Sequence, residues 1–206
     1  MARSIGKASL LGAMLSLSVA SGAWAADVNT IVAGCTNCHD KDGASTSPNM
    51  PIIAGMSAAY ITDEIADYKK KERPCPDTEV RAGDKKGTKT NMCDVVKDLS
   101  DADVKGVAAF FAGKKFVPAQ QSFDAAQAKK GQGIAQQNCE KCHSKNGSLA
   151  DDDSGFLAGQ WTPYLKEQLT LFTSGKRTAD PKMKPVIAKL DNDAFDALLN
   201  FYASLK

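Results

Sequence analysis

The pentapeptide Cys35-Thr36-Asn37-Cys38-His39 occurs a second time, 104 residues further along the chain, as Cys139-Glu140-Lys141-Cys142-His143. Cys-x-x-Cys-His is the attachment signature of a c-type haem. Two cysteines three positions apart lie on the same side of one helical turn, so both thiols can form thioethers with the two vinyl groups of a haem. The histidine that follows then projects toward the iron as its proximal ligand. The pattern predicts two covalently bound haem c groups, attached through Cys35, Cys38, Cys139 and Cys142.

Both histidines of the sequence, His39 and His143, belong to these motifs. The competing interpretations of a Cys-x-x-Cys pair are a thioredoxin-like redox centre and a zinc site. A redox pair does not require the following histidine, and the sequence has no further Cys/His pair with the spacing of zinc ligands. Haem attachment is therefore the interpretation that uses every residue of both motifs.

The similarity between the two halves extends beyond the motifs. The offset of 104 residues holds as far as Tyr60 and Tyr164 and then falls to 91, so the first half carries 13 additional residues between Tyr60 and Met92. The further matching pairs are Ile53-Ala54-Gly55 with Leu157-Ala158-Gly159, Met92 with Met183, Leu99 with Leu190, and Phe110 with Phe201. This repetition predicts two copies of one unit of about 90 residues. We expect a first domain over residues 26–115 and a second over 116–206. The join lies within residues 115–124 (KFVPAQQSFD), where Pro118 and polar residues interrupt the helical pattern.

Each unit shows the apolar spacing of helices, at positions i, i+3, i+4 and i+7. Ser100 and Asp103 resemble a capping box at the start of one such helix. No alternating strand pattern of useful length occurs, so we predict an all-α protein in which a large apolar cofactor completes the core of each unit. The apolar positions are Val104, Val107, Ala108 and Phe111 in the first unit, and Leu165, Leu169, Phe172, Phe195, Leu198, Leu199 and Tyr202 in the second.

Residues 1–25 have the three parts of a secretory signal peptide. Arg3 and Lys7 give a basic start, residues 10–20 are an apolar run, and residues 23–25 (AWA) fit the small-x-small cleavage rule. The run is too short for an ordinary transmembrane helix, and an uncleaved anchor is the alternative. We expect a periplasmic protein with no membrane span after cleavage, in a compartment where disulfides can form.

The composition is that of an ordinary globular protein, with 43% hydrophobic and 24% charged residues, and excludes a disordered or collagen-like chain. The 26 basic residues nearly balance the 24 acidic ones, and cleavage of the signal peptide would remove two of the basic residues and none of the acidic ones. A dominant basic surface is therefore absent, and we expect no nucleic acid among the partners.

The second axial ligand of each iron is predicted by elimination. Because both histidines are proximal ligands, neither iron can have two of them, and Met183 is the one methionine of the second unit. Its equivalent in the first unit is Met92, with Met50 and Met56 as competitors. The alternative is that Met92 and Met183 only fill gaps in the core. We predict His39 with Met92 and His143 with Met183, a ligand pair that favours reduced iron and suits electron transfer.

Cys75 and Cys93 lie outside the haem motifs and flank the insertion in the first half. In an oxidising compartment we expect them to form a disulfide, which would hold the insertion and keep Met92 at the iron. The alternative is Cys93 as a thiolate ligand of a low-potential haem; free thiols are the third interpretation.

The repeated motifs, each followed by a methionine before a last amphipathic helix, resemble the tandem dihaem cytochromes of the cytochrome c4 type over essentially all of the mature chain. That resemblance implies an all-α fold of two tandem class I cytochrome c domains, each wrapped around one covalent haem. The second half also resembles the dihaem cytochrome subunit of flavocytochrome c sulfide dehydrogenase, through residues 118–124 (PAQQSFD), 139–143 (CEKCH), 157–165 (LAGQWTPYL) and 201–204 (FYAS).

Two features depart from the flavocytochrome pattern. The insertion that carries Cys75 and Cys93 is not part of it. We expect Pro48 to supply the carbonyl that orients His39, but the equivalent residue of the second unit is Asp152, so that unit must orient its histidine otherwise.

The resemblance to flavocytochrome c implies a periplasmic heterodimer, in which this chain accepts electrons from an FAD-containing, sulfide-oxidising flavoprotein subunit. The chain is then not catalytic alone and passes electrons through two His/Met haems to a small cytochrome or an oxidase. The alternative is a free-standing dihaem carrier of the cytochrome c4 type that delivers electrons to a terminal oxidase. A third class, a haem enzyme acting on a small sulfur compound, would need an open or thiolate-ligated iron.

Overall fold

The computed structural model describes Met1 and residues 27–206. Apart from Met1, the predicted signal peptide at 1–25 lies outside the described residues. None of the helices in the described part of the chain is long and apolar enough to cross a membrane. The regular structure is almost entirely helical, which confirms the predicted all-α class.

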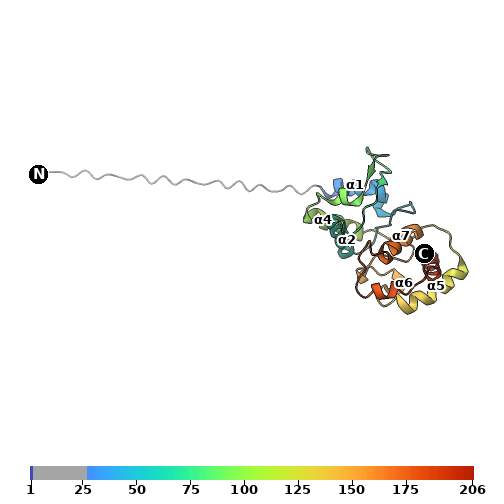
Figure 1. Cartoon of the computed structure of the whole chain (residues 1–206). Coiled ribbons are helices and arrows are strands. Elements are labelled where there is room, and N and C mark those ends of the chain that lie inside the picture. The colour runs from blue at the N-terminus through green and yellow to red at the C-terminus, as the bar shows by residue number, and fades with distance from the viewer. Residues whose placement is uncertain (2–26) are drawn as a thin grey trace.

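The helices fall into two consecutive groups, one in each half of the chain (Figure 1). The first group is followed in the chain by an irregular segment over 113–124 that leads to the second. The elements of the first half are α1 (Val28–His39), η1 (Lys41–Gly43), α2 (Ala58–Lys70), β1 (Thr78–Glu79), β2 (Lys89–Thr90), α3 (Met92–Val96) and α4 (Asp101–Ala112). Those of the second half are α5 (Ala125–Asn138), α6 (Ser144–Gly147), η2 (Ala150–Asp152), α7 (Thr162–Thr173), α8 (Lys184–Ile187) and α9 (Asn192–Ser204).

Each half has its own apolar core, built where its first and last long helices pack together. In the first half Val32 of α1 lies in one cluster with Val107 and Phe111 of α4. In the second half α5 and α9 approach so closely that a Cβ atom on Gly131 would lie 2.0 Å from the carbonyl oxygen of Ala197. Glycine is required there because any side chain would overlap the backbone of α9.

Equivalent backbone hydrogen bonds support the repeat and both of its offsets. The N–H of Gly55 donates to the carbonyl of Phe111 at 2.8 Å, and the N–H of Gly159 donates to that of Tyr202 at 2.9 Å. The donors are 104 residues apart and the acceptors 91 apart. The two halves therefore share one internal geometry, and the 13 extra residues lie between the donor and the acceptor.

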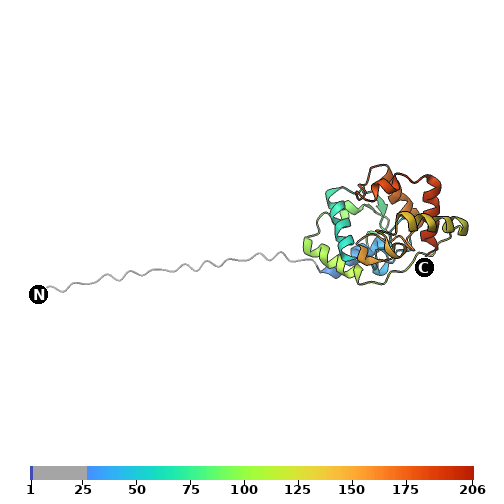
Figure 2. The ribbon, with the colours of Figure 1, turned by 90° about the horizontal axis from the view of Figure 1, so that it is seen from below.

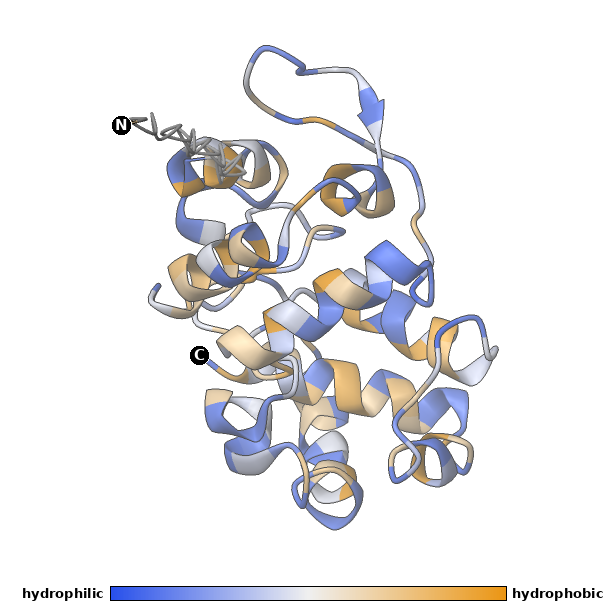
Figure 3. Ribbon diagram, turned by 90° about the vertical axis from the view of Figure 1, so that its left-hand side faces the viewer, coloured by the Kyte–Doolittle hydropathy of each residue, from blue (hydrophilic) through white to orange (hydrophobic). Residues whose placement is uncertain are grey.

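The extra residues form a hairpin that extends from the first half. Two-residue strands pair antiparallel, with Thr78 opposite Thr90 and Glu79 opposite Lys89. The sequence did not indicate these strands, because two residues each are too few to show an alternating pattern. Figure 3 shows this loop projecting from the body, hydrophilic over most of its length. Cys75 and Cys93 are joined by a disulfide across its base, which confirms the predicted pairing.

The two halves lie against each other (Figure 2). The buried side chain of Gln160 donates to the carbonyl of Ile52 at 2.9 Å and accepts from the N–H of Ile52 at 3.0 Å. The indole N–H of Trp161 donates to the carbonyl of Ser45 at 2.8 Å. A small apolar cluster around Ile52, Ala54 and Ala119 completes this contact.

The start of α4 shows the predicted capping box. The hydroxyl of Ser100 accepts from the N–H of Asp103 at 3.2 Å, and the carboxylate of Asp103 accepts from the N–H of Ser100 at 2.9 Å. These bonds satisfy backbone donors that a helix start otherwise leaves without a partner.

We predict that Ser100→Ala lowers the free energy of unfolding by about 1 kcal/mol, because the cap is lost while the core is kept. Urea unfolding followed by circular dichroism measures the change. Ser122→Ala, on the exposed connecting segment, is the control and should have no effect. Equal stability of the Ser100→Ala protein and the control would contradict a stabilising cap.

Candidate haem-attachment sites

The first haem motif forms the last turn of α1, so the two cysteines and the histidine share one helical turn. Cys35 packs against the core of the first half. His39 is buried, and its Nδ1 lies 3.0 Å from the carbonyl oxygen of Pro51. Because a carbonyl only accepts hydrogen bonds, Nδ1 carries the proton and Nε2 is left as the atom that can ligate a metal.

The orienting carbonyl belongs to Pro51 and not to Pro48, so that prediction was wrong. The chain turns between the two prolines, where the N–H of Met50 donates to the carbonyl of Ser47 at 3.0 Å. This turn places the later proline beside the imidazole. The identity of the orienting residue depends on a local turn that the sequence pattern did not reveal.

The second motif begins where α5 ends. Cys139 is the C-cap residue of that helix, and the motif continues as a turn in which the N–H of His143 donates to the carbonyl of Cys139 at 3.0 Å. The Nδ1 of His143 lies 3.2 Å from the hydroxyl of Ser154. As predicted, the second unit orients its histidine differently, here through a hydroxyl group.

Burial favours the neutral form of the histidine and of the first cysteine in each motif. Burial lowers the pKa of His39 and that of His143, so each imidazole is neutral and can act as a ligand. Burial also raises the pKa of the Cys35 thiol to about 11 and raises that of Cys139.

All four motif cysteines are free of disulfides, whereas the other two cysteines of the chain are paired with each other. The thiols that a haem would need are thus present and in place beside a neutral histidine. The residues fit covalent attachment of one haem to each unit.

The two predicted methionine ligands begin short helices at equivalent places. Met92 is the first residue of α3, and its side chain packs against the same apolar cluster as Cys35. Met183 is the N-cap residue of α8. The competitor Met56 is a buried member of the first cluster as well, so the structure places two methionine side chains around one core.

Arg81, in the insertion, contacts the first motif and was missed by sequence reasoning. Its backbone N–H donates to the carbonyl of Asn37 at 3.1 Å, and its guanidinium donates to the carbonyl of Cys38 at 3.0 Å. The guanidinium also donates to the carboxylate of Asp40 at 3.0 Å. The insertion therefore supports the attachment turn of the first unit. The second unit lacks this insertion and so has no equivalent of Arg81.

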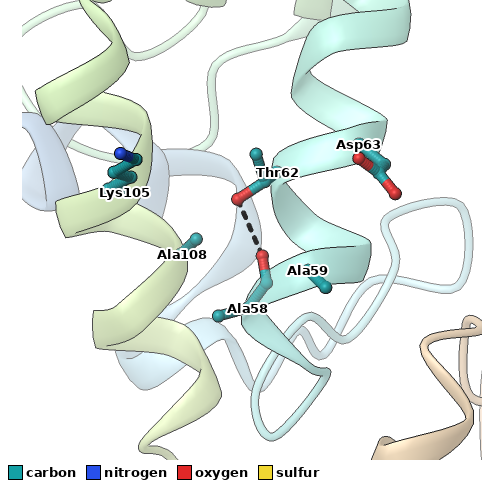
Figure 4. A pocket seen from close by; sticks show the side chains of 6 residues that line it. All are labelled: Ala58, Ala59, Thr62, Asp63, Lys105 and Ala108. Atoms are coloured by element: carbon teal, nitrogen blue, oxygen red, sulfur yellow. Dashed lines mark hydrogen bonds between the residues drawn. The ribbon is translucent and has the colours of Figure 1, made fainter.

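A hollow between α2 and α4 is separate from these sites (Figure 4). Among the described residues, those lining it belong to neither haem motif. The hydroxyl of Thr62 donates to the carbonyl of Ala58 at 2.8 Å and so serves its own helix. The hollow is lined by Ala58, Ala59, Thr62, Asp63, Lys105 and Ala108.

Comparisons with known proteins give a consistent picture. The cytochrome c family matches residues 25–113. The chain is 35% identical over 187 residues to a cytochrome c4 of Stutzerimonas stutzeri, covering 84% of this chain and 85% of that protein. The crystal structure of reduced recombinant cytochrome c4 from Pseudomonas stutzeri superposes with a TM-score of 0.68 at 31% identity, covering 87% of this chain and 99% of that one. A thiosulfate dehydrogenase electron acceptor of Thiomonas intermedia is 26% identical, over 83% of this chain and 76% of its own length.

The disulfide closes a loop with a sequence separation of 18 residues. We predict that replacing both cysteines with serine (Cys75→Ser, Cys93→Ser) lowers the free energy of unfolding by about 3 kcal/mol, because the unfolded chain regains the entropy of that loop. Denaturant unfolding of the two proteins tests this. Peptide mapping of the unreduced protein is the companion measurement, and two readily alkylated thiols would contradict the pairing.

We predict that Ser154→Ala raises the reduction potential of the haem held by the second unit and leaves the first unchanged. With Nε2 bound to iron, Nδ1 keeps its proton and donates it to the Ser154 hydroxyl. Such a bond increases the basicity of the imidazole and stabilises ferric iron, so its loss favours the reduced state. Spectroelectrochemical titration measures both potentials. Ser148→Ala, an exposed serine whose hydroxyl donates to the carbonyl of Lys145, is the control. A potential equal to that of the control would refute a role for Ser154.

Proposed function

The chain belongs to the cytochrome c4 family of dihaem class I cytochromes c, and from this premise we propose that it is a free-standing periplasmic carrier between a donor enzyme and a terminal oxidase. It carries two covalently bound haem c groups and serves in electron transfer. Each haem, when bound, exchanges one electron at its iron. The observation that supports the assignment best is the pair of free-thiol motifs, each next to a neutral, hydrogen-bonded histidine.

We assign the thioether bonds of the first haem to Cys35 and Cys38, and those of the second to Cys139 and Cys142. His39 and His143 are the proximal ligands. Their Nδ1 atoms are engaged with Pro51 and Ser154, so that Nε2 of each ring is the atom available to the metal.

We assign the remaining axial positions to Met92 and Met183. Met92 starts α3 directly after Asn91, whose side chain caps that helix by accepting from the N–H of Asp94 at 3.0 Å. The disulfide at Cys93 ties the same turn to the base of the hairpin. A thioether in this position raises the potential and fills the coordination shell. Neither unit then offers a vacant site, so the chain acts as a carrier and not as an enzyme on its own.

The two interpretations of the sequence, a flavocytochrome c subunit and a free-standing carrier, predict different partners. A subunit of a flavocytochrome c would be held by an FAD-containing protein, whereas the two cytochromes c4 reported above match this chain over 85% and 99% of their own lengths. The free carrier therefore fits them better than the flavoprotein-bound subunit.

A second candidate follows from the similarity to a thiosulfate dehydrogenase electron acceptor. On that reading the donor is an enzyme that oxidises a small sulfur compound, thiosulfate or sulfide, and the chain only receives the electrons. The net charge of the mature chain is near zero, which fits a partner held by a mixed surface better than one attracted by charge alone.

Replacement of the methionine thioethers tests the ligand assignment. We predict that Met92→Leu and Met183→Leu each open one iron to cyanide and lower its potential, because leucine keeps the volume but removes the sulfur. Met56→Leu, in the core of the first half, is the matched control and should keep both irons closed. Cyanide binding by the Met56→Leu protein with none by Met92→Leu would move the first ligand to Met56.

Stopped-flow mixing tests the partner. The oxidised holoprotein is mixed with thiosulfate dehydrogenase and thiosulfate, with a sulfide-oxidising flavoprotein and sulfide, or with each sulfur compound alone. We expect fast haem reduction only where an enzyme is present, because both irons are closed to sulfur ligands. Rapid reduction by sulfide or thiosulfate alone would contradict the carrier function.

A further inference from the structure

Four polar side chains form a closed ring between the two halves. Glu64 of α2 and Arg73 come from the first half, while Gln168 of α7 and Arg177 come from the second. Both arginines are buried, with side chains 5% and 9% exposed, and the side chain of Glu64 is 14% exposed. Charged groups are rarely buried in this way unless they are paired.

Within the ring, each of the two arginines donates to one acceptor from each half. Arg73 donates to the carboxylate of Glu64 within its own half, and to the side-chain oxygen of Gln168 across the seam at 3.0 Å. Arg177 donates to Gln168 within its half at 2.7 Å, and to the other oxygen of Glu64 across the seam. Arg73 also donates to the hydroxyl of Tyr164 at 3.0 Å.

The ring is pseudo-symmetric because its members are equivalent under the repeat. The offset of 104 residues, which the structure extends beyond Tyr60 as far as Arg73, relates Glu64 to Gln168 and Arg73 to Arg177. The same offset relates the two aromatic side chains that pack against the guanidinium groups. Arg73 lies 4.7 Å from the aromatic centroid of Tyr68, and Arg177 lies 4.5 Å from that of Phe172. The halves thus present the same surface to each other, around an approximate two-fold axis.

The symmetry is broken at one pair of equivalent positions, where the first half has a carboxylate, Glu64, and the second half has a neutral amide, Gln168. Glu64 is ionisable and Gln168 is not, so two guanidinium groups share a single carboxylate and the ring has a net charge of +1. Both arginines remain cationic at any ordinary pH. Without Glu64 the two cations would face each other across the seam with only a neutral amide between them, and the halves would repel each other there.

We propose that Glu64 is the positioning residue that fixes the two haem-binding halves relative to each other and thereby sets the rate of electron transfer between the haems. The proposal rests on the proposed function, since it needs both halves to carry a haem. Electron tunnelling slows steeply as donor and acceptor separate, so a loosened seam slows the step even when each haem site is intact.

Comparison of Glu64→Gln with Glu72→Gln tests the proposal. Both changes remove one negative charge from the first half, but Glu72 is exposed and its carboxylate lies 4.0 Å from the ammonium group of exposed Lys70. The probe is the holoprotein, with one haem reduced by a short pulse and equilibration followed by absorbance. We expect equilibration to be roughly tenfold slower in Glu64→Gln, as small misplacements of reacting groups produce such losses, and unchanged in Glu72→Gln.

A charge swap and a scattering measurement separate positioning from simple damage. The double variant Glu64→Gln, Gln168→Glu moves the carboxylate to the equivalent place across the ring, where both arginines can still reach it, and should restore the rate. Small-angle scattering should show a larger radius of gyration for Glu64→Gln than for the swap.

Each outcome has one meaning. Unchanged equilibration and an unchanged radius in Glu64→Gln would overturn the proposal, and so would failure of the swap to restore a slowed rate. Absence of any exchange between the haems of the unaltered protein would also overturn the proposal. If the unaltered protein does not bind two haems, the proposed function fails instead, because that result does not involve Glu64.

Discussion

A helical unit of about 90 residues has only a limited apolar core of its own, and this constraint shapes the rest of the structure. Each half brings its first and last helices together, with contacts as close as that of Gly131 with Ala197. Each half also directs a cysteine, Cys35 or Cys139, against its core. An apolar cofactor bonded at that place becomes part of the core. A cofactor bound there would add its own apolar surface to the core of each half.

The two halves share one geometry but differ in the groups around each attachment site. His39 is oriented by a carbonyl, which can only accept, whereas His143 is oriented by a hydroxyl, which can accept or donate. The first attachment turn is also braced by the cation of Arg81, from the insertion. Since ligand basicity and nearby charge both tune a haem, two units with the same fold need not have the same potential.

The seam between the halves combines a small apolar cluster with buried polar and charged side chains. Buried ion pairs contribute little net stability compared with apolar packing, but they tolerate only a narrow geometry. The bonds of Gln160 to Ile52 and of Trp161 to Ser45 are similarly directional. Such a seam suits a carrier that must hold two cofactors at a constant separation. The disulfide-closed hairpin belongs to the first half alone. The two halves therefore differ at the surface as well as around their attachment sites.

The sequence by itself determined the helical class and the repeat, and it favoured the capping box at Ser100 and the pairing of Cys75 with Cys93 over their alternatives. These depend on local spacing, or on residue types so scarce that few partners remain. Only the tertiary structure decided that Pro51, and not Pro48, orients His39, and that Arg81 reaches Cys38. It alone brought Glu64 within reach of Arg177, a residue 113 positions away. No periodicity encodes such contacts, because they arise only when separately formed helices pack and bring distant side chains together.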